Sequence, residues 1–325
     1  MPNTMKQLQI VEPGKAEWRD APVPQPGPGE VLVKVHGVTT CPQWDLHIMD
    51  GIPMFPDGEL TYPYTPGQPG HEGVGEVVAL GPGVTAPKVG TPVSMWRDPG
   101  HHRPGCYAQY AAFDIENLIE VPPGLPVEAI APLELAMCVQ VSFDQIAKVC
   151  DLGGARFGVS GLGPAGLVAI QMARIRGARH VVGIDPLPQR REIAARLGAQ
   201  TVAPPDPQLF PADRWGDTAL DAALDATGLK PSIEFLMDRT RQVVAIFGVL
   251  REQVEFGPAH WGGLALLGYG QFSRQAAQRA LDRVLSGQLD LAALVTKKLP
   301  FTRYAEGVAL LRTKQAVKIC FLPWE

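Results

Sequence analysis

The stretch that decides the fold is Arg156-Phe157-Gly158-Val159-Ser160-Gly161-Leu162-Gly163-Pro164-Ala165-Gly166. A short apolar run ends in a G-x-G-x-x-G pattern and continues into the amphipathic segment Gly166–Arg176, which predicts strand, tight turn and helix. Gly161 permits the turn, Gly163 lets the backbone approach a pyrophosphate, and Gly166 lets the helix pack close to the strand. Free N–H groups at the start of that helix attract phosphates. The pattern therefore predicts a dinucleotide-binding unit.

The next predicted strand, His180–Asp185 (HVVGID), ends in an acidic residue 19 positions after Gly166. A carboxylate there accepts hydrogen bonds from the ribose hydroxyls and repels a 2′-phosphate, which favours NAD over NADP. Arg190 follows closely and would instead support a 2′-phosphate. Thr227 closely follows a further predicted strand, which ends at Asp225, where the nicotinamide half is expected. The candidate cofactor-binding residues are Gly161, Gly163, Pro164, Gly166, Asp185, Arg190 and Thr227.

Strands and helices alternate through this half of the chain. Helices are predicted at Ser142–Cys150, Gly166–Arg176, Gln189–Leu197 and Arg274–Ser286, and further strands at Ala219–Asp225 and Gln242–Phe247. This rhythm predicts a doubly wound parallel sheet with helices on both faces, the Rossmann arrangement.

Residues 12–126 have a different composition, rich in Pro and Gly with short β-type runs such as Val31–Val35, Gly75–Leu80 and Pro92–Trp96. They predict an irregular β-rich domain. The last strand-like run, Val317–Leu322, is expected to return to this domain and pair there. Because 325 residues exceed one ordinary core, two domains are predicted: 1–142 completed by 287–325, and 143–286.

Bulk composition excludes several classes of protein. The net charge is −4, hydrophobic residues make up 46% and charged residues 19%, and no basic block suggests a nucleic-acid partner. No segment predicts a signal peptide or a membrane helix, so a cytoplasmic protein is expected. Five scattered cysteines argue against a disulfide framework.

Two cysteines and one histidine could form a metal site. Cys41 lies 30 residues before His71, and Cys138 lies 67 residues after it. Two thiolates and one imidazole suit Zn²⁺ and leave one coordination position open. Spacing alone does not show that such distant residues converge.

Several stretches together resemble the zinc-type medium-chain dehydrogenase/reductase (alcohol dehydrogenase) family. They are Pro24–Val35 (PQPGPGEVLVKV), Gly70–Val84 (GHEGVGEVVALGPGV), Gly105–Tyr110 (GCYAQY), the loop Gly161–Gly166 with Asp185, and Lys314–Leu322. The second stretch is similar to the family's GHExxGxVxxxGxxV signature at every fixed position. The resemblance covers essentially the whole chain. It implies a GroES-like β-rich catalytic domain joined to a Rossmann cofactor domain.

The resemblance also implies a site. Cys41, His71 and Cys138 would bind one catalytic Zn²⁺ per chain, with Glu72 as an alternate fourth ligand or a residue behind the ligands. Cys138 stands 23 residues before Gly161, about where the family has its third ligand. Glu134 is the competing candidate, because polyol-type members use a glutamate near this position.

Departures from the family pattern concern the first ligand and one lobe. In Cys41-Pro42-Gln43-Trp44-Asp45 the aspartate comes four residues after the cysteine instead of three, and Trp44 replaces a proton-relaying hydroxyl. Thr39, Thr40 or a water molecule would take the place of that hydroxyl, and His47 matches a relay position of some members. Asp45 is expected to orient His71, and Trp44 to shape the substrate pocket. The four-cysteine lobe with which the family binds a structural zinc is absent: the segment Trp96–Tyr110 has one cysteine, so no second zinc is predicted.

The expected function is hydride transfer between NAD(H) and a small alcohol or its ketone or aldehyde, by a homodimer or homotetramer. An alternative in the same superfamily is a zinc-free, NADPH-dependent enone or quinone reductase, and a third is a non-catalytic binding protein. Pocket candidates are Tyr62, Met95, His101 and His102, although the two histidines are predicted to lie in a solvated loop.

Overall fold

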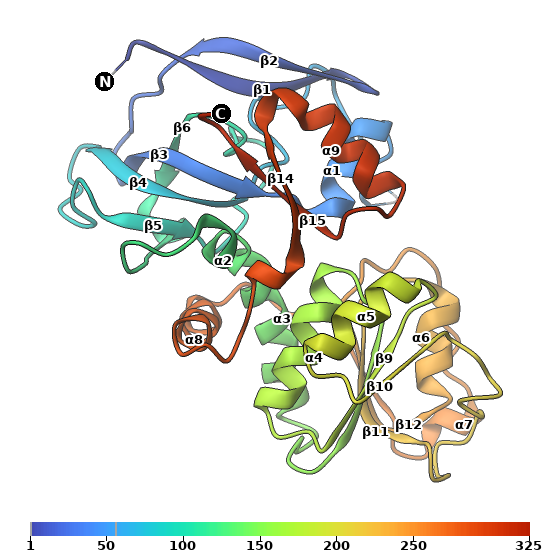
Figure 1. Cartoon of the computed structure of the whole chain (residues 1–325). Coiled ribbons are helices and arrows are strands. Elements are labelled where there is room, and N and C mark those ends of the chain that lie inside the picture. Colours follow the sequence, from blue (N-terminus) through green and yellow to red (C-terminus); the bar gives the residue numbers. More distant parts are fainter. Residues whose placement is uncertain (1, 56) are drawn as a thin grey trace. The chain divides into compact units, whose positions relative to one another are not determined.

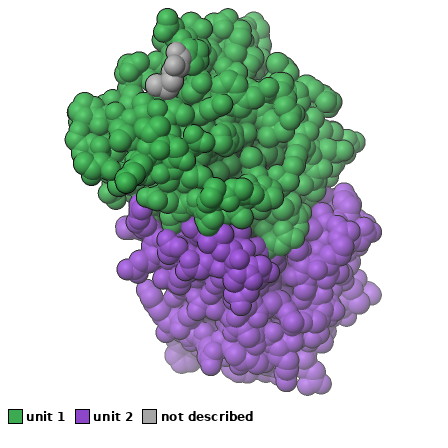
Figure 2. All heavy atoms as spheres, turned by 60° about the vertical axis from the view of Figure 1, so that its left-hand side comes forward, with its two compact units in different colours: residues 1–137, 290–325 green, residues 138–289 purple. Residues whose placement is uncertain are grey.

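The computed structural model describes residues 2–55 and 57–325, which form two compact units (Figures 1 and 2). Unit 1 comprises residues 1–137 and 290–325, and unit 2 comprises residues 138–289. The sequence had placed these boundaries at 142/143 and 286/287. Among the described residues, no helix is both long enough and apolar enough to cross a membrane.

Unit 1 is built on a mixed sheet. Its strands are β3 (Glu30–Thr39), β4 (Glu72–Leu80), β5 (Pro92–Met95), β6 (Tyr110–Asp114), β7 (Leu118–Glu120), β14 (Val295–Pro300) and β15 (Lys318–Leu322). The order is β14-β15-β3-β4-β5-β7, and β6 also pairs with β3. Because β15 pairs antiparallel with β3, the predicted return of the C-terminal strand to this domain is confirmed.

The remaining elements of unit 1 surround this sheet. They are the antiparallel hairpin β1 (Thr4–Glu12) and β2 (Lys15–Pro22), and the helices α1 (Pro42–Asp50), α2 (Val127–Ile130) and α9 (Tyr304–Arg312). The sequence did not predict the hairpin, because β2 is largely polar and exposed or half-buried, without a clear apolar alternation. Inward-facing valines of β3 and aromatic residues such as Tyr107, Phe113 and Phe321 form the core.

Unit 2 contains a parallel sheet. Its strands are β8 (Arg156–Ser160), β9 (His180–Ile184), β10 (Thr201–Ala203), β11 (Leu220–Asp225), β12 (Thr240–Ile246) and β13 (Ala265–Leu267). The order is β10-β9-β8-β11-β12-β13, and all neighbours are parallel. The order reverses direction between β8 and β11, which is the switch point where doubly wound sheets bind ligands at their carboxyl ends.

The helices of this part of the chain are α3 (Leu133–Ile146), α4 (Pro164–Ile175), α5 (Pro188–Arg196), α6 (Lys230–Met237), α7 (Pro258–Trp261) and α8 (Arg274–Leu285). The predicted helix Ser142–Cys150 is wrong in its bounds, because α3 begins at Leu133 and ends at Ile146. Most side chains of α3 are buried all round. Such a helix lacks the one-sided apolar stripe that would have marked its start.

Candidate functional site

The pairing of β3 with β4 brings two of the predicted ligands together. Thr39 lies opposite Glu72 in the register, so the chain leaving β3 passes His71 at the start of β4. Cys41 then occupies the N-cap position of α1. Ligand atoms of Cys41, His71 and Glu72 all lie within 4.8 Å of one another. The GHE segment and the first cysteine therefore converge as the sequence predicted.

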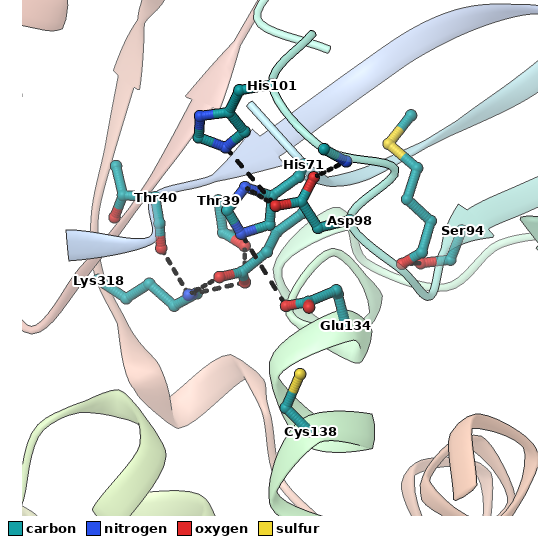
Figure 3. Close-up of polar contacts among 12 residues, drawn as sticks. Thr39, Thr40, His71, Ser94, Asp98, His101, Glu134, Cys138 and Lys318 are labelled. Carbon is teal, nitrogen blue, oxygen red and sulfur yellow. Dashed lines mark hydrogen bonds and ion pairs between the residues drawn. The ribbon is translucent and has the colours of Figure 1, made fainter. Parts of the chain in front are cut away.

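The first turn of α3 supplies a further carboxylate. Oε2 of Glu134 lies 4.0 Å from Nε2 of His71 (Figure 3). Cys138 lies one helical turn further along α3 and belongs to neither of the close groups of potential metal ligands among the described residues. Its Sγ instead accepts a hydrogen bond from Tyr269 Oη at 2.9 Å. The structure thus brings the competing candidate, Glu134, beside His71.

Glu72 is held by a buried ion pair that the sequence analysis missed. Lys318 Nζ lies 2.7 Å from the Glu72 carboxylate and also donates to the backbone oxygen of Thr40. Thr39 Oγ1 donates to the same carboxylate at 2.9 Å. The exposed fractions are 0% for Lys318 and 1% for Glu72, so removal of either charge would leave the other buried without its partner. Lys318 starts the closing strand but follows Cys41 by more than 270 residues, which no spacing rule connects.

The electrostatics of the site favour a cation. Burial raises the pKa of the Cys41 thiol well above its usual range, and Glu72 and Glu134 raise it further, while Lys318 lowers it. Burial lowers the pKa of His71, so its ring is neutral at neutral pH and keeps a lone pair for a metal. Sulfur, imidazole nitrogen and carboxylate oxygen are the donors that Zn²⁺ prefers. The donor set therefore fits zinc, whose charge would offset the crowded anions.

Asp45 does not orient His71, and that expectation is wrong. Its Oδ1 accepts hydrogen bonds from Tyr107 Oη and Tyr304 Oη, each at 2.8 Å. Its Oδ2 and Nδ1 of His71 both lack hydrogen-bond partners in the described part of the chain. One extra residue after Cys41 turns the aspartate by about 100° around the helix axis, which directs it into the aromatic core.

The loop after β5 places a second carboxylate beside His71. Asp98 Oδ2 lies 3.9 Å from Nδ1 of His71 and 3.5 Å from Nε2 of His101 (Figure 3). The side chain of His101 is only 11% exposed, so its prediction as a solvated loop residue is wrong. His102 is exposed, as predicted. The loop lacks the usual lobe of four cysteines, and its short path brings Asp98 inward. In the sequence, the pair His101-His102 so soon after Asp98 could have indicated this cluster.

Trp44 and His47 extend the site along α1. The Trp44 ring packs against His101 with centroids 4.2 Å apart, and its edge meets Phe55 at 6.1 Å. His47 Nδ1 lies 3.0 Å from the backbone oxygen of Ile52. The proposed substitutes for the missing hydroxyl are already engaged: Thr39 Oγ1 binds Glu72, and the Oγ1 of Thr40 accepts the N–H of Ile319 at 3.0 Å.

The three glycines of the dinucleotide loop differ in how much room a side chain would have. Gly161 has φ +85°, a conformation that favours glycine, and a Cβ there would lie 2.5 Å from Thr227 Cγ2. A Cβ on Gly166 would lie 1.9 Å from the backbone oxygen of Gly161. A Cβ on Gly163 would meet only Arg190 Nη1 at 3.8 Å, so open space remains beside its backbone. Gly163 is the N-cap of α4, and Pro164 follows it at the first helical position.

Asp185 closes the loop from the end of β9. Its carboxylate accepts the backbone N–H of Leu162 and of Leu187, each at 2.8 Å, and Arg190 Nη1 lies 3.7 Å away. At the end of β11, Asp225 accepts the hydroxyl of Thr227 at 2.7 Å. The residues predicted for cofactor binding thus gather at the carboxyl ends of adjacent strands.

Family models match both units. The alcohol dehydrogenase GroES-like domain matches residues 27–123, and the zinc-binding dehydrogenase domain matches residues 164–286. The chain belongs to the zinc-type medium-chain dehydrogenase family. As a member it is a zinc-dependent oxidoreductase, which transfers a hydride between a nicotinamide cofactor and an alcohol/carbonyl pair.

Relatives align over nearly the whole chain. An L-threonine 3-dehydrogenase of Chelativorans sp. (strain BNC1) is 29% identical, covering 98% of this chain and 99% of its own. The enzyme of the same name from Escherichia coli (strain K12) is 27% identical, with 99% and 100% covered. The solved 2R,3R-butanediol dehydrogenase from Bacillus subtilis has a TM-score of 0.85 at 24% identity, covering 98% of this chain and 99% of that one. A dehydrogenase structure from Sinorhizobium meliloti 1021 bound to NADP has the same TM-score at 23% identity, covering 99% and 100%.

Proposed function

We propose that this dehydrogenase oxidises a small secondary alcohol with NAD, using one zinc ion held by Cys41, His71 and Glu134. The observation that carries the proposal is the convergence of the Cys41, His71 and Glu72 donors within 4.8 Å, with Glu134 Oε2 4.0 Å from His71. Three protein ligands leave a position for substrate oxygen. Cys138, one turn beyond Glu134, is the alternative third ligand.

When bound, zinc supplies a Lewis acid that polarises the alcohol oxygen and makes its proton easier to remove. The protein holds the donors in place for this chemistry. Lys318 and Thr39 fix the Glu72 carboxylate behind them. His47, whose Nδ1 lies 3.0 Å from the backbone oxygen of Ile52, is the predicted proton relay.

The third ligand is tested by comparing Glu134→Ala with Cys138→Ser. We expect Glu134→Ala to lose zinc, measured by elemental analysis, and to lower kcat/KM by about 10³-fold, since a Lewis acid contributes several kcal/mol. Cys138→Ser should keep zinc and most of the turnover, and both variants should still bind NADH. Loss of zinc in Cys138→Ser alone would instead assign the cysteine as ligand.

The zinc-free reductase that the sequence left as an alternative makes a different prediction. It predicts a purified wild-type chain without zinc that reduces enones or quinones with NADPH. Elemental analysis of the wild type, together with NADPH-coupled enone reduction, separates the two functions. Stoichiometric zinc with no enone reduction would support the alcohol dehydrogenase.

The preference for NAD depends on Asp185. Its buried carboxylate lies at the end of β9 near the open face of Gly163, where its negative charge opposes a 2′-phosphate. Arg190 lies 3.7 Å from that carboxylate and favours the opposite preference. Values of kcat/KM for NAD and NADP decide between them: a higher value with NADP would contradict our proposal.

For the substrate we propose a secondary alcohol, because two relatives that align over nearly the whole chain bear the name L-threonine 3-dehydrogenase. Trp44 and Phe55 add an aromatic wall near the metal donors, on which an apolar part of the substrate would pack. A screen of NADH absorbance with L-threonine, vicinal diols, and aliphatic and aromatic secondary alcohols tests this proposal. Faster turnover of primary alcohols throughout would contradict it.

We also propose a homodimer or homotetramer. Phe256 and Trp261 line a surface hollow of unit 2 with Gly257 and Pro258, and are 47% and 84% exposed. Exposed aromatic patches commonly mark association surfaces. Sedimentation equilibrium gives the mass, and a Trp261→Ser variant should weaken the assembly if this patch is buried in it. A monomeric wild type would contradict the proposal.

A further inference from the structure

The two ring nitrogens of His71 face two different carboxylates. Nε2 lies 4.0 Å from Glu134 Oε2, and Nδ1 lies 3.9 Å from Asp98 Oδ2. The side chain is 3% exposed, and Nδ1 has no hydrogen-bond partner in the described part of the chain. A buried N–H without an acceptor costs about 1–3 kcal/mol. The carboxylate that Nδ1 faces is therefore the natural acceptor for it.

Asp98 is fixed by its own surroundings. The carboxylate accepts the N–H of Gly100 through Oδ1 at 2.8 Å, so Oδ2 is directed between the rings of His71 and His101 (Figure 3). One carboxylate oxygen is thus held by the backbone, and the other faces the imidazole of His71.

His101 supports Asp98 from the other side. Its Nδ1 lies 2.8 Å from the hydroxyl of Tyr64, and its ring packs against Trp44. With both flanks fixed, Nε2 of His101 faces the carboxylate at 3.5 Å. The chain of contacts from Tyr64 through His101 leads to Asp98 and ends at His71. All of these residues belong to unit 1.

Asp45, which the family pattern would use for this purpose, is committed elsewhere. Its Oδ1 binds the hydroxyls of Tyr107 and Tyr304, which belong to the aromatic core. These two hydrogen bonds hold the carboxylate among the aromatic rings, and none joins it to His71 in the part of the chain that the structure describes. Asp98 needs a shift of only about 1 Å to move from 3.9 Å to hydrogen-bond distance of Nδ1.

We propose that Asp98, and not Asp45, is the positioning residue of the metal site: its carboxylate accepts Nδ1–H of His71 and holds the Nε2 lone pair toward the metal. The inference rests on the zinc site proposed above. A carboxylate behind a ligating histidine fixes the tautomer and raises the basicity of the ring, and its loss typically lowers metal affinity 10- to 100-fold.

The test compares Asp98→Asn with Asp45→Asn in the full-length protein. Zinc affinity is measured by competition with a chromophoric chelator, and ¹⁵N chemical shifts of labelled histidine report the tautomer of His71. We expect Asp98→Asn to weaken zinc binding 10- to 100-fold. Asp98→Glu should recover part of that loss, because it restores the charge. Asp45→Asn should change the affinity less than about threefold.

The wild-type spectrum keeps the inference testable even if Asp98→Asn does not fold. With zinc bound, His71 should carry its proton on Nδ1 and coordinate through Nε2. The opposite tautomer would overturn the inference, as would unchanged zinc affinity in folded Asp98→Asn. A wild-type chain that binds no zinc would overturn the proposed function, and this inference with it. Zinc binding with the opposite tautomer would overturn the inference alone.

Discussion

The metal site and the dinucleotide loop are built in different ways. The loop is one continuous segment, Gly161–Gly166, and its function depends mainly on backbone geometry. Gly161 has a positive φ, Gly166 lies close to the Gly161 oxygen, and Gly163 leaves open space beside its backbone. The proposed metal site collects side chains from the end of β3, the N-cap of α1, the start of β4, the loop after β5, α3 and β15. A glycine fingerprint therefore identifies the first site from spacing, while the second depends on side chains that only folding brings together.

The two sites should also respond differently to mutation. Unit 1 contains buried charged groups that compensate one another, so the removal of one leaves another exposed to a low-dielectric interior. The loop in unit 2 responds mainly to added volume. Four substitutions test this contrast.

The largest effect is expected for Lys318→Met. It leaves the Glu72 carboxylate buried without its counter-charge, which should lower the free energy of unfolding of unit 1 by about 3–5 kcal/mol. Urea unfolding measures it. Lys6→Met removes an exposed pair with Asp20 and should cost less than about 1 kcal/mol. Equal losses in the two variants would show that the buried pair has no special role.

Asp45→Asn should change how stability depends on pH. Burial raises the pKa of Asp45 to about 7, against about 3.9 in an unfolded chain. Between these values the unfolded chain releases the proton while the folded chain retains it, so wild-type stability falls as pH rises from about 4 to 7. The variant should lack that decline, which is about 4 kcal/mol. Parallel stability curves in chemical denaturation would contradict this.

Gly166→Ala tests the close approach in the loop. The added Cβ would lie 1.9 Å from the Gly161 oxygen, and relieving that overlap should cost about 1–3 kcal/mol and weaken NADH binding. Gly163→Ala is the matched control, since its Cβ meets only the flexible end of Arg190. It should leave the melting temperature nearly unchanged while weakening NADH binding. Similar melting temperatures in both variants would refute the distinction.

The smallest effect is expected for Asp185→Asn, which keeps an oxygen for a backbone N–H of the loop but removes the charge. The ratio of kcat/KM for NAD over NADP should fall about 10-fold, or about 1.4 kcal/mol. Arg190→Ala is the companion variant and should move the ratio the other way. An unchanged ratio in Asp185→Asn would mean that this carboxylate serves only the loop.

Sequence alone determined the family, the two-domain architecture and the dinucleotide loop. These features could be predicted because glycines, strand ends and the GHE signature act through neighbours in the chain. The meeting of Cys41 with His71 was implied only by the family resemblance, since their spacing does not show it. The sequence predicted the return of the last strand but not the buried lysine at its start, nor the hairpin β1–β2.

Only the tertiary structure decided which side chains surround the metal donors. Glu134 and Cys138 share a helix and differ by one turn, so helical periodicity cannot choose between them. Asp45 and Asp98 differ in whether they face His71 because one added residue rotates α1 and a short loop replaces a cysteine lobe. Both changes alter the direction in which a side chain points, and the spacing of residues in the sequence does not reveal that direction.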